Sequence, residues 1–427
     1  MRAFRIIVIA MFLVTSVASN ALGSFLPSAP GKAEPQHLRW KGRALRIAVS
    51  LSLVEPNSNI KTDSDVLGAI NRSVQAWRGV ADLDIQIDFS DKLSVSPAGV
   101  SGDGVSLITI AQSPENVLLF SKDPLATSAK TRVFYSGKGF ITEGDIVLNP
   151  FQQFSTDGTF GTFDLESTLT HEIGHLLGLR HSSVLGATMS DSLSKNGTFG
   201  LADFGARTLA ETDIAAAREL YGVNSDGDAC CAVIAGKLTA ASGRAAKNLR
   251  VWAEESITGR VVAQSDAGVD GGFRLGGLPA GSYSVFWQKN DDLAPSAIGS
   301  LGAYKIEKGE TRTLSEKVVL SRSKITLSYI GVNSQLTDSA VTLGAGREYM
   351  IYLGGKNLDP RKVAIEFNSP YFTVMQNSLS EQNFGDGVSV INLVISVHPE
   401  TPAGVYSIFV TGRDGSISSL IGALNVQ

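Results

Sequence analysis

The chain has 427 residues, of which 43% are hydrophobic and 18% are charged. This composition excludes a disordered chain, and at about 150 residues per domain the length predicts roughly three domains. The formal net charge is −4, from 37 basic and 41 acidic residues. The basic surplus of nucleic-acid-binding proteins is therefore missing, and we expect no nucleic-acid partner.

Residues 1–23 have the layout of a secretory signal peptide. Arg2 and Arg5 precede the apolar run Ile6 to Val14, and small residues follow up to Gly23. The apolar run is shorter than the about 20 residues that cross a bilayer, so we expect no stable membrane span. An uncleaved anchor or a buried first helix would be the alternatives. The sequence thus predicts a secreted, extracellular protein, which could also associate with a cell surface.

Residues 24–36 are rich in Pro, Ala and Gly and are predicted to be a flexible lead-in, and residues 37–223 are predicted to form one α+β domain. Alternating apolar residues predict strands, and apolar residues three and four apart predict helices. The predicted strands are Arg46 to Leu53, Leu83 to Phe89, Ser106 to Ala111 and Asp145 to Leu148. Three helices are predicted. The first is capped by Asp63 or Ser64 and has Val66, Ile70, Val74 and Trp77 on one face. The second runs from Leu165 to Leu177, between the N-cap Asp164 and Gly178, and the third runs from Thr212 to Tyr221 and ends at Gly222.

The character of the chain changes after a polar linker, predicted at residues 224–231. Short alternating segments separated by Gly, Pro, Asn and Asp predict β-sandwiches at 232–321 and 322–427, without helices. Gly276 to Gly281 is predicted to be a turn between two strands. The clearest strands of the last unit are Val390 to Val397 and Tyr406 to Val410.

Two cysteines are present, at the adjacent positions Cys230 and Cys231. In an exported protein they could form a vicinal disulfide or pair with another chain, and they could equally remain free thiols. A vicinal disulfide closes no loop of chain, so we expect stability to come from the hydrophobic cores and from bound metal.

The stretch from His171 to His181, HEIGHLLGLRH, holds three of the five histidines. His171 and His175 are four residues apart on a predicted helix, so both rings project from one face. Gly178 lets the chain leave the helix and bring His181 to the same point. Three nitrogen ligands with a fourth position left for water are the arrangement of a catalytic zinc site. Glu172 can lie beside that water without binding the metal and is the predicted catalytic general base.

This motif resembles that of the metzincin clan of zinc endopeptidases, HExxHxxGxxH followed by a methionine turn. Within the clan it is most similar to the matrixins, the matrix-metalloproteinase type, because Ser182 follows the third histidine and Met189 lies eight positions after it. The resemblance implies that Met189 forms an apolar floor under the metal without binding it. It extends over roughly residues 37–223: Trp77 and its neighbours look like the first matrixin helix, and residues 209–222 look like the closing helix.

Three departures from the matrixin pattern limit what the resemblance implies. Asp191 stands where matrixins usually have a proline near the wall of the specificity pocket, so the resemblance implies no substrate preference. Val147 replaces a histidine of the structural zinc site, so we expect one catalytic zinc and no structural zinc. No cysteine precedes Cys230, so the thiol latency switch is expected to be absent. Carboxylates and carbonyls would allow calcium sites, but none can be assigned to particular residues.

The two β-rich regions also show resemblances. Three stretches look like parts of a carboxypeptidase-regulatory-like β-sandwich: Ile234 to Lys237, Gly271 to Leu275 and Leu278 to Tyr283. Gly354 to Leu358 and Pro402 to Tyr406 look like parts of an immunoglobulin-like TIG module of bacterial surface proteins. These resemblances imply either a spacer and stabilising role or the binding of a cell-surface or matrix ligand, and fold alone does not decide between them.

The sequence therefore predicts a multidomain protein with an α+β metzincin catalytic domain followed by two all-β sandwich domains. The predicted function is that of a secreted zinc endopeptidase, whose protein or peptide substrates bind in extended form along an edge strand of the sheet. The alternative is a surface adhesion or carbohydrate-binding protein with a vestigial protease domain. The intact histidines and Glu172 argue against that alternative.

Overall fold

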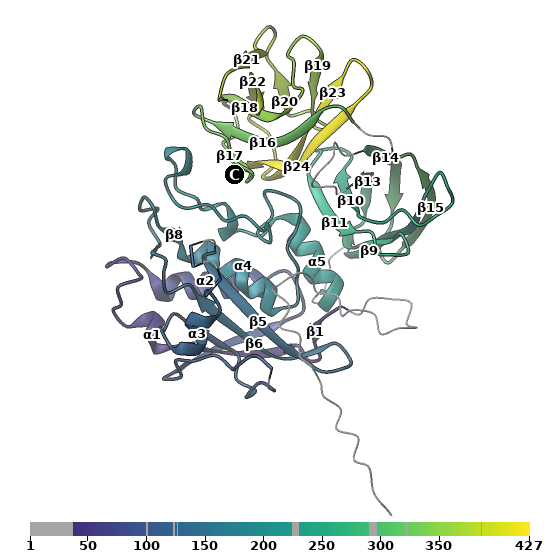
Figure 1. Cartoon of the computed structure of the whole chain (residues 1–427). Coiled ribbons are helices and arrows are strands. Elements are labelled where there is room, and N and C mark those ends of the chain that lie inside the picture. Colours follow the sequence, from purple (N-terminus) through teal and green to yellow (C-terminus); the bar gives the residue numbers. More distant parts are fainter. Residues whose placement is uncertain are drawn as a thin grey trace, which may run out of the picture.

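The structure is a computed structural model that describes residues 37–99, 101–122, 124–125, 127–223, 230–289, 297–320, 323–385 and 387–427. The predicted signal peptide, the lead-in, most of the predicted linker and the predicted boundary near residue 321 lie outside these residues. The described chain forms three units (Figure 1), which we call the N-terminal unit (37–223), the middle unit (230–320) and the C-terminal unit (323–427).

A mostly parallel sheet forms the base of the N-terminal unit. Its strands are β1 (Arg39–Trp40), β2 (Ala44–Ser50), β3 (Asp84–Ser90), β4 (Leu107–Thr109), β5 (Ala129–Tyr135) and β6 (Phe140–Leu148). The strand order is β1-β6-β4-β2-β3, and β5 pairs antiparallel with the other edge of β6. Among the strands that the structure describes, β5 pairs with β6 alone, so it is an edge strand.

Five α-helices accompany this sheet in the described residues, and two of them make the centre of the unit. The helices are α1 (Leu51–Val54), α2 (Val66–Arg78), α3 (Pro114–Leu118), α4 (Leu165–Leu176) and α5 (Glu211–Tyr221), with 3-10 turns η1 (Thr198–Gly200) and η2 (Gly205–Arg207) and a small sheet of β7 (Phe154–Ser155) and β8 (Phe163–Asp164). Helices α2 and α4 lie side by side on one face of the sheet (Figure 1). Trp77 of α2 is fully buried and donates a hydrogen bond to the carbonyl of Thr170 in α4 (2.9 Å), which fixes the two helices together.

The predicted strands of the N-terminal unit are found with different bounds. The predicted strand Arg46 to Leu53 is wrong at its end, because the side chain of Ser50 accepts a hydrogen bond from the backbone N–H of Ser52 (3.3 Å) and α1 begins there. Leu53 is buried, but it belongs to helix α1 and not to the strand. Strand β5 is missing from the prediction, because its residues are mostly half-buried and show little apolar alternation.

The predicted helices are confirmed as α2, α4 and α5, and Asp164 caps α4 as predicted. The predicted cap of α2 is wrong: Asp65, and neither Asp63 nor Ser64, accepts the hydrogen bond from the backbone N–H of Gly68 (2.9 Å). Asp63 instead adopts a left-handed conformation (φ 71°) two residues before the helix cap.

The middle unit consists of two sheets around one apolar core. Its strands are β9 (Cys230–Ala240), β10 (Leu249–Glu255), β11 (Val261–Asp266), β12 (Gly272–Pro279), β13 (Gly281–Lys289), β14 (Ile298–Ile306) and β15 (Thr311–Val318). The orders are β11-β10-β13-β14 and β12-β9-β15. The predicted turn Gly276 to Gly281 is wrong. Strand β12 continues to Pro279 with irregular register, and the chain changes sheets at Ala280.

The C-terminal unit also consists of two sheets around its own core. Its strands are β16 (Thr326–Val332), β17 (Val341–Leu343), β18 (Glu348–Lys356), β19 (Val363–Glu366), β20 (Phe372–Val374), β21 (Ser380–Gln382), β22 (Ser389–Val397), β23 (Gly404–Gly412) and β24 (Ile417–Val426). The orders are β16-β18-β22-β20, with β21 also on β22, and β17-β24-β23-β19. The two strands predicted here are confirmed within β22 and β23. No helix occurs in the described residues after 229, as predicted.

Strand β9 begins at Cys230, so both cysteines belong to a strand and not to the predicted linker. Cys230 and Cys231 form a vicinal disulfide, which decides between the three alternatives left open by the sequence. In the part of the chain that the structure describes, no helix is long and apolar enough to cross a membrane.

The three units lie against one another (Figure 1), and they share one apolar cluster. It contains Val184, Ala187 and Ala210 of the N-terminal unit, Trp252 and Val261 of the middle unit, and Val405, Phe409 and Ile421 of the C-terminal unit. All eight side chains are buried. The two β-rich units are therefore packed against the N-terminal unit and against each other.

Candidate metal centre

Helix α4 carries the first part of the motif and is buried along its whole length. It begins where the Asp164 carboxylate accepts a hydrogen bond from the backbone N–H of Ser167 (2.8 Å). It ends at Leu176, and Gly178 follows with φ 95°, a left-handed conformation that turns the chain out of the helix. This exit sends His181 back towards the two histidines of the helix.

The three predicted ligands come together. One ring nitrogen from each of His171, His175 and His181 lies within 4.8 Å of the other two, and the described residues contain no other such histidine, cysteine or carboxylate group. His171 and His175 are buried, whereas His181 is exposed. The group therefore lies at the surface end of a buried helix face, where solvent and a ligand can reach it.

Hydrogen bonds orient the two helix histidines. Nδ1 of His171 lies 2.7 Å from the carbonyl oxygen of Thr188, and Nδ1 of His175 lies 2.9 Å from that of Leu179. A carbonyl oxygen only accepts, so each Nδ1 carries the proton and each Nε2 keeps a lone pair. Ring orientation and tautomer are thus set for binding a metal through Nε2.

Burial also keeps these rings neutral. It lowers the pKa of His171 to about 4 and the pKa of His175 well below its usual value, and it lowers the pKa of His181 as well. A histidine binds metal only in its neutral form. At neutral pH the three rings need lose little or no proton to act as ligands.

Glu172 is buried next to this group. Its carboxylate accepts a short hydrogen bond from the hydroxyl of Thr131 in β5, and the same hydroxyl lies 3.2 Å from the backbone carbonyl of Glu172. Burial raises the pKa of Glu172 to about 7, while the Thr131 hydroxyl and nearby Lys130 lower it. A carboxyl group with a pKa near neutrality can both take up and release a proton at physiological pH.

Met189 packs beneath the same helix and is 1% exposed. A Cβ added at Gly174 would lie 2.2 Å from the sulfur of Met189, so only a glycine in α4 permits this contact. The Asp213 carboxylate of α5 accepts hydrogen bonds from the backbone N–H groups of Thr188 (2.8 Å), Met189 (3.2 Å) and Ala210 (3.1 Å). Asp213 therefore holds the turn that contains both Met189 and the hydrogen-bond partner of His171.

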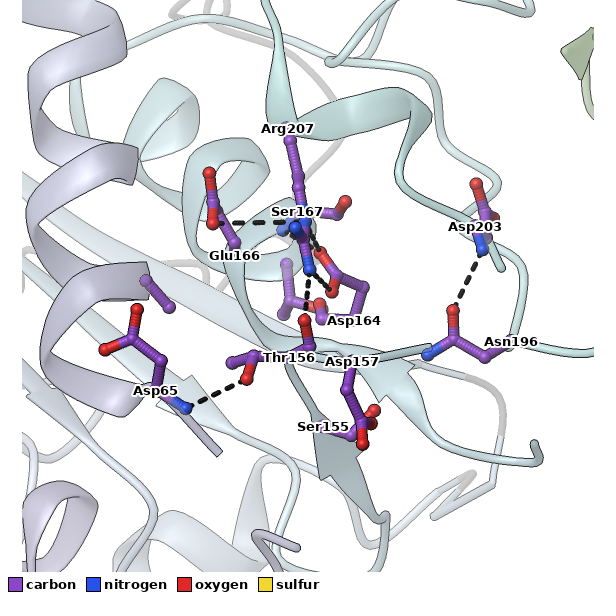
Figure 2. A network of polar contacts seen from close by, with 12 residues as sticks. Asp65, Ser155, Thr156, Asp157, Asp164, Glu166, Ser167, Asn196, Asp203 and Arg207 are labelled. Atoms are coloured by element: carbon purple, nitrogen blue, oxygen red, sulfur yellow. Dashed lines mark hydrogen bonds and ion pairs between the residues drawn. The ribbon is translucent and has the colours of Figure 1, made fainter. Parts of the chain in front are cut away.

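A second polar contact holds the beginning of α4 (Figure 2). Arg207 donates to both carboxylate oxygens of Asp164, from Nε (3.0 Å) and from Nη2 (2.6 Å), and to the carbonyl of Thr156 (2.7 Å). Asp164 is almost fully buried, so this two-pronged pair is well shielded from water. It ties the end of the loop after Met189 to the first turn of the helix that carries His171.

The residues that hold the motif in place were not predicted from the sequence. Thr131 and Arg207 lie far from it along the chain and belong to no recognisable pattern. Asp213 had a usable signal, because an acidic residue in the first turn of a helix caps backbone N–H groups. No signal of this kind linked Asp213 to the turn around Met189.

The residues present fit a zinc ion. Three neutral imidazoles with one exposed side are the donor set of a catalytic zinc site. In His171 and His175 the hydrogen bond from Nδ1 to a carbonyl oxygen leaves Nε2 for the metal, which is the usual support of a zinc ligand. The region where Val147 stands is different: Val147 is fully buried among apolar residues and offers no donor for a second zinc.

Comparison with known proteins agrees with this geometry. Residues 121–222 match the Matrixin family model. The chain is 28% identical over 197 residues to Metalloendoproteinase 1 of Glycine max, covering 44% of this chain and 53% of that protein. It is 48% identical over 67 residues to Metalloendoproteinase 5-MMP of Arabidopsis thaliana, covering 15% of this chain and 16% of that protein.

The chain thus spans about half the length of the first of these relatives. Among solved structures, the major pilin subunit BcpA of Bacillus cereus is 13% identical and covers 46% of this chain and 70% of its own, with a TM-score of 0.19, too low to support a shared fold. The N-terminal unit therefore contains a matrixin-like domain, with a histidine group that could bind the metal that matrixins imply.

Proposed function

We propose that this protein is a secreted zinc endopeptidase that hydrolyses peptide bonds of extracellular proteins. The observation that carries the proposal is the group formed by His171, His175 and His181 with the buried carboxyl of Glu172 beside it. The similarity of residues 121–222 to matrixins supports the same reaction class. In this proposal the three histidines bind one zinc ion, Glu172 is the catalytic residue and Met189 is the apolar floor.

The proposed roles follow from the surroundings of each side chain. When bound, zinc would lower the pKa of a water molecule towards 7 and polarise the scissile carbonyl. Glu172 accepts the proton of the attacking water and then delivers it to the leaving amine, which its pKa near 7 permits. Thr131 keeps the Glu172 carboxylate turned towards β5, so that it faces the substrate side of the helix.

We propose β5 as the strand along which the substrate binds. It is an edge strand, and its residue Thr131 contacts Glu172 directly. A peptide in extended form can add to such an edge through backbone hydrogen bonds, which would place its scissile bond next to Glu172. The turn that contains Thr188, the hydrogen-bond partner of His171, also borders the metal group.

The proposal extends to the rest of the chain. The layout of residues 1–23 supports export. Two sheets around one core in each β-rich unit are compatible with carboxypeptidase-regulatory-like and immunoglobulin-like β-sandwiches, and binding of a cell-surface or matrix ligand by these units is a proposal from that resemblance alone. Calcium binding likewise remains a proposal without assigned residues.

The test is metal analysis of the purified protein combined with digestion of a peptide library, with and without a chelator. We expect one zinc per chain, and cleavage that the chelator abolishes and added zinc restores. Zinc-loaded protein that cleaves no peptide, while residues 230–427 bind a defined glycan or matrix protein, would refute the proposal and favour a binding function.

A further inference from the structure

The segment after the third histidine links the metal group to the rest of the molecule. We call residues 182–207 the site loop. Its Thr188 carbonyl holds His171, its Met189 lies under α4, and Arg207 at its end holds the cap of α4. The site loop therefore borders the metal group and holds the helix that carries it.

The other face of the site loop is covered by the C-terminal unit. The backbone N–H groups of Leu185 and Gly186 donate to the carbonyls of Ile421 and Gly422 in β24, both at 2.9 Å. A Cβ at Gly186 would lie 2.5 Å from a methyl group of Val405 and 3.0 Å from the carbonyl oxygen of Gly422, so the two segments pack too closely for a side chain. Two backbone hydrogen bonds thus join the start of the site loop to β24 of the C-terminal unit.

A second contact lies farther along the site loop, at Phe199. Phe199 has φ 58°, a conformation that L side chains rarely adopt, and it packs on the core of the C-terminal unit. Its backbone N–H donates to Oε1 of Gln335 (2.9 Å), and its carbonyl accepts from Nδ2 of Asn333 (3.0 Å). Such a conformation persists only where surrounding contacts hold it, and here the hydrogen-bonding contacts come from another unit.

The turn that makes this contact is itself unusual. Asn333 (φ 52°) and Ser334 (φ 59°) are both left-handed, and the backbone N–H of Gln335 closes the turn on the carbonyl of Val332 (3.1 Å). This is the geometry of a tight hairpin turn, which presents the two amide side chains in fixed directions. Between the two contacts, the hydroxyl of Ser192 lies 2.9 Å from that of Ser339.

We propose that the C-terminal unit determines which peptides the metal centre accepts, by fixing the shape of the site loop through Asn333 and Gln335. This inference rests on the proposed function. In this proposal a peptide added to β5 passes between β5 and the site loop, so that side chains next to its scissile bond meet the site loop. Asn333 and Gln335 are positioning residues: they touch neither metal nor substrate, and they act through Phe199.

The test uses the full-length, zinc-loaded protein with the double substitution Asn333→Ala and Gln335→Ala. The matched control is the double substitution Gln376→Ala and Asn383→Ala, which removes the same two amides at exposed positions of the same unit, outside the site loop contact. Three quantities are measured for each protein: zinc per chain, amide hydrogen exchange of residues 190–204, and kcat/KM over a peptide library.

We expect the site-loop variant to keep one zinc per chain and to exchange the amides of residues 190–204 roughly tenfold faster, because two hydrogen bonds to Phe199 are lost. Its preference between peptides should fall at least about fivefold, with KM changing more than kcat. A purely stabilising contact would lower activity equally for all peptides.

The control should match the wild type in all three quantities. An active wild type whose site-loop variant keeps both the exchange rates and the preference between peptides overturns this inference and leaves the proposed function intact. A zinc-loaded wild type that cleaves no peptide overturns both. Unchanged preference with faster exchange also overturns the inference, because the loop would then move without selecting substrates.

Discussion

The buried Glu172 gives a prediction that can be tested without a substrate. In the zinc-free protein, burial raises the pKa of Glu172 from its ordinary value of 4.5 to about 7. The protonated carboxyl is therefore compatible with the fold, and ionisation is opposed. The contribution of the protonated Glu172 carboxyl to the stability of the folded protein is therefore fully present below pH 4.5 and is lost as the pH rises through 7. Glu172→Gln replaces this group by a neutral side chain of similar shape.

The size of the effect follows from the same values. A rise of the pKa from 4.5 to about 7 corresponds to about 3 kcal/mol between the protonated and the ionised state. We expect zinc-free Glu172→Gln to gain up to about 3 kcal/mol in free energy of unfolding over the wild type between pH 5 and pH 8.5. This difference in free energy of unfolding is the stability that the wild type loses by keeping an ionisable carboxyl group in an apolar site.

The assay is urea unfolding of chelator-treated protein, followed by tryptophan fluorescence at the two pH values. Glu55→Gln, at an exposed position of the same unit, is the matched control for the loss of one carboxylate. If the stability difference between Glu172→Gln and the wild type is the same at pH 5 and pH 8.5, the carboxyl does not titrate as its burial requires, and the reasoning about the general base is refuted.

Three further substitutions test the supports of the metal group. Gly174→Ala should destabilise the protein by about 1–3 kcal/mol, because the new Cβ would lie 2.2 Å from the Met189 sulfur. A competition assay should also show weaker zinc binding. Wild-type stability and wild-type zinc binding would contradict the close packing of Gly174 on Met189. Asp213→Ala should cost about 2–4 kcal/mol in chemical unfolding, because it leaves three buried N–H groups without their carboxylate, and a loss below about 0.5 kcal/mol would show that the turn holds itself. Thr131→Val removes a hydrogen bond that lowers the pKa of Glu172, so the acidic limb of the kcat/KM profile should move to higher pH, whereas Thr131→Ser should leave it in place; movement to lower pH would contradict the assigned sign.

The local part of the site could be predicted from the sequence because its determinants are close together along the chain. The spacing of His171 and His175, the cap at Asp164 and the exit at Gly178 all act within one helix and its ends. The same holds for α5, which ends at Gly222 as predicted. Such features depend on the backbone period and on single caps, which the sequence displays directly.

The supporting part could not be predicted because its partners are distant in sequence and follow no period. Thr131 reaches Glu172 across 41 residues, and Phe199 meets Gln335 across 136. The prediction of a turn at Gly276 to Gly281 was wrong for a related reason. The alternating segments on either side of it do not reveal that β12 and β13 belong to different sheets. The packing of the C-terminal unit on the site loop depends on shape, which one sequence does not encode in any readable pattern.

The central claim is that Glu172 acts as the general base of a zinc centre held by three histidines. The most direct measurement compares zinc-loaded wild type with zinc-loaded Glu172→Gln on one peptide that the wild type cleaves, with the zinc content of both determined in the same samples. The account predicts one zinc per chain in both proteins and a loss of about 10²–10⁴-fold in kcat/KM for the variant. A variant that holds zinc and hydrolyses the peptide at nearly the wild-type rate would contradict it.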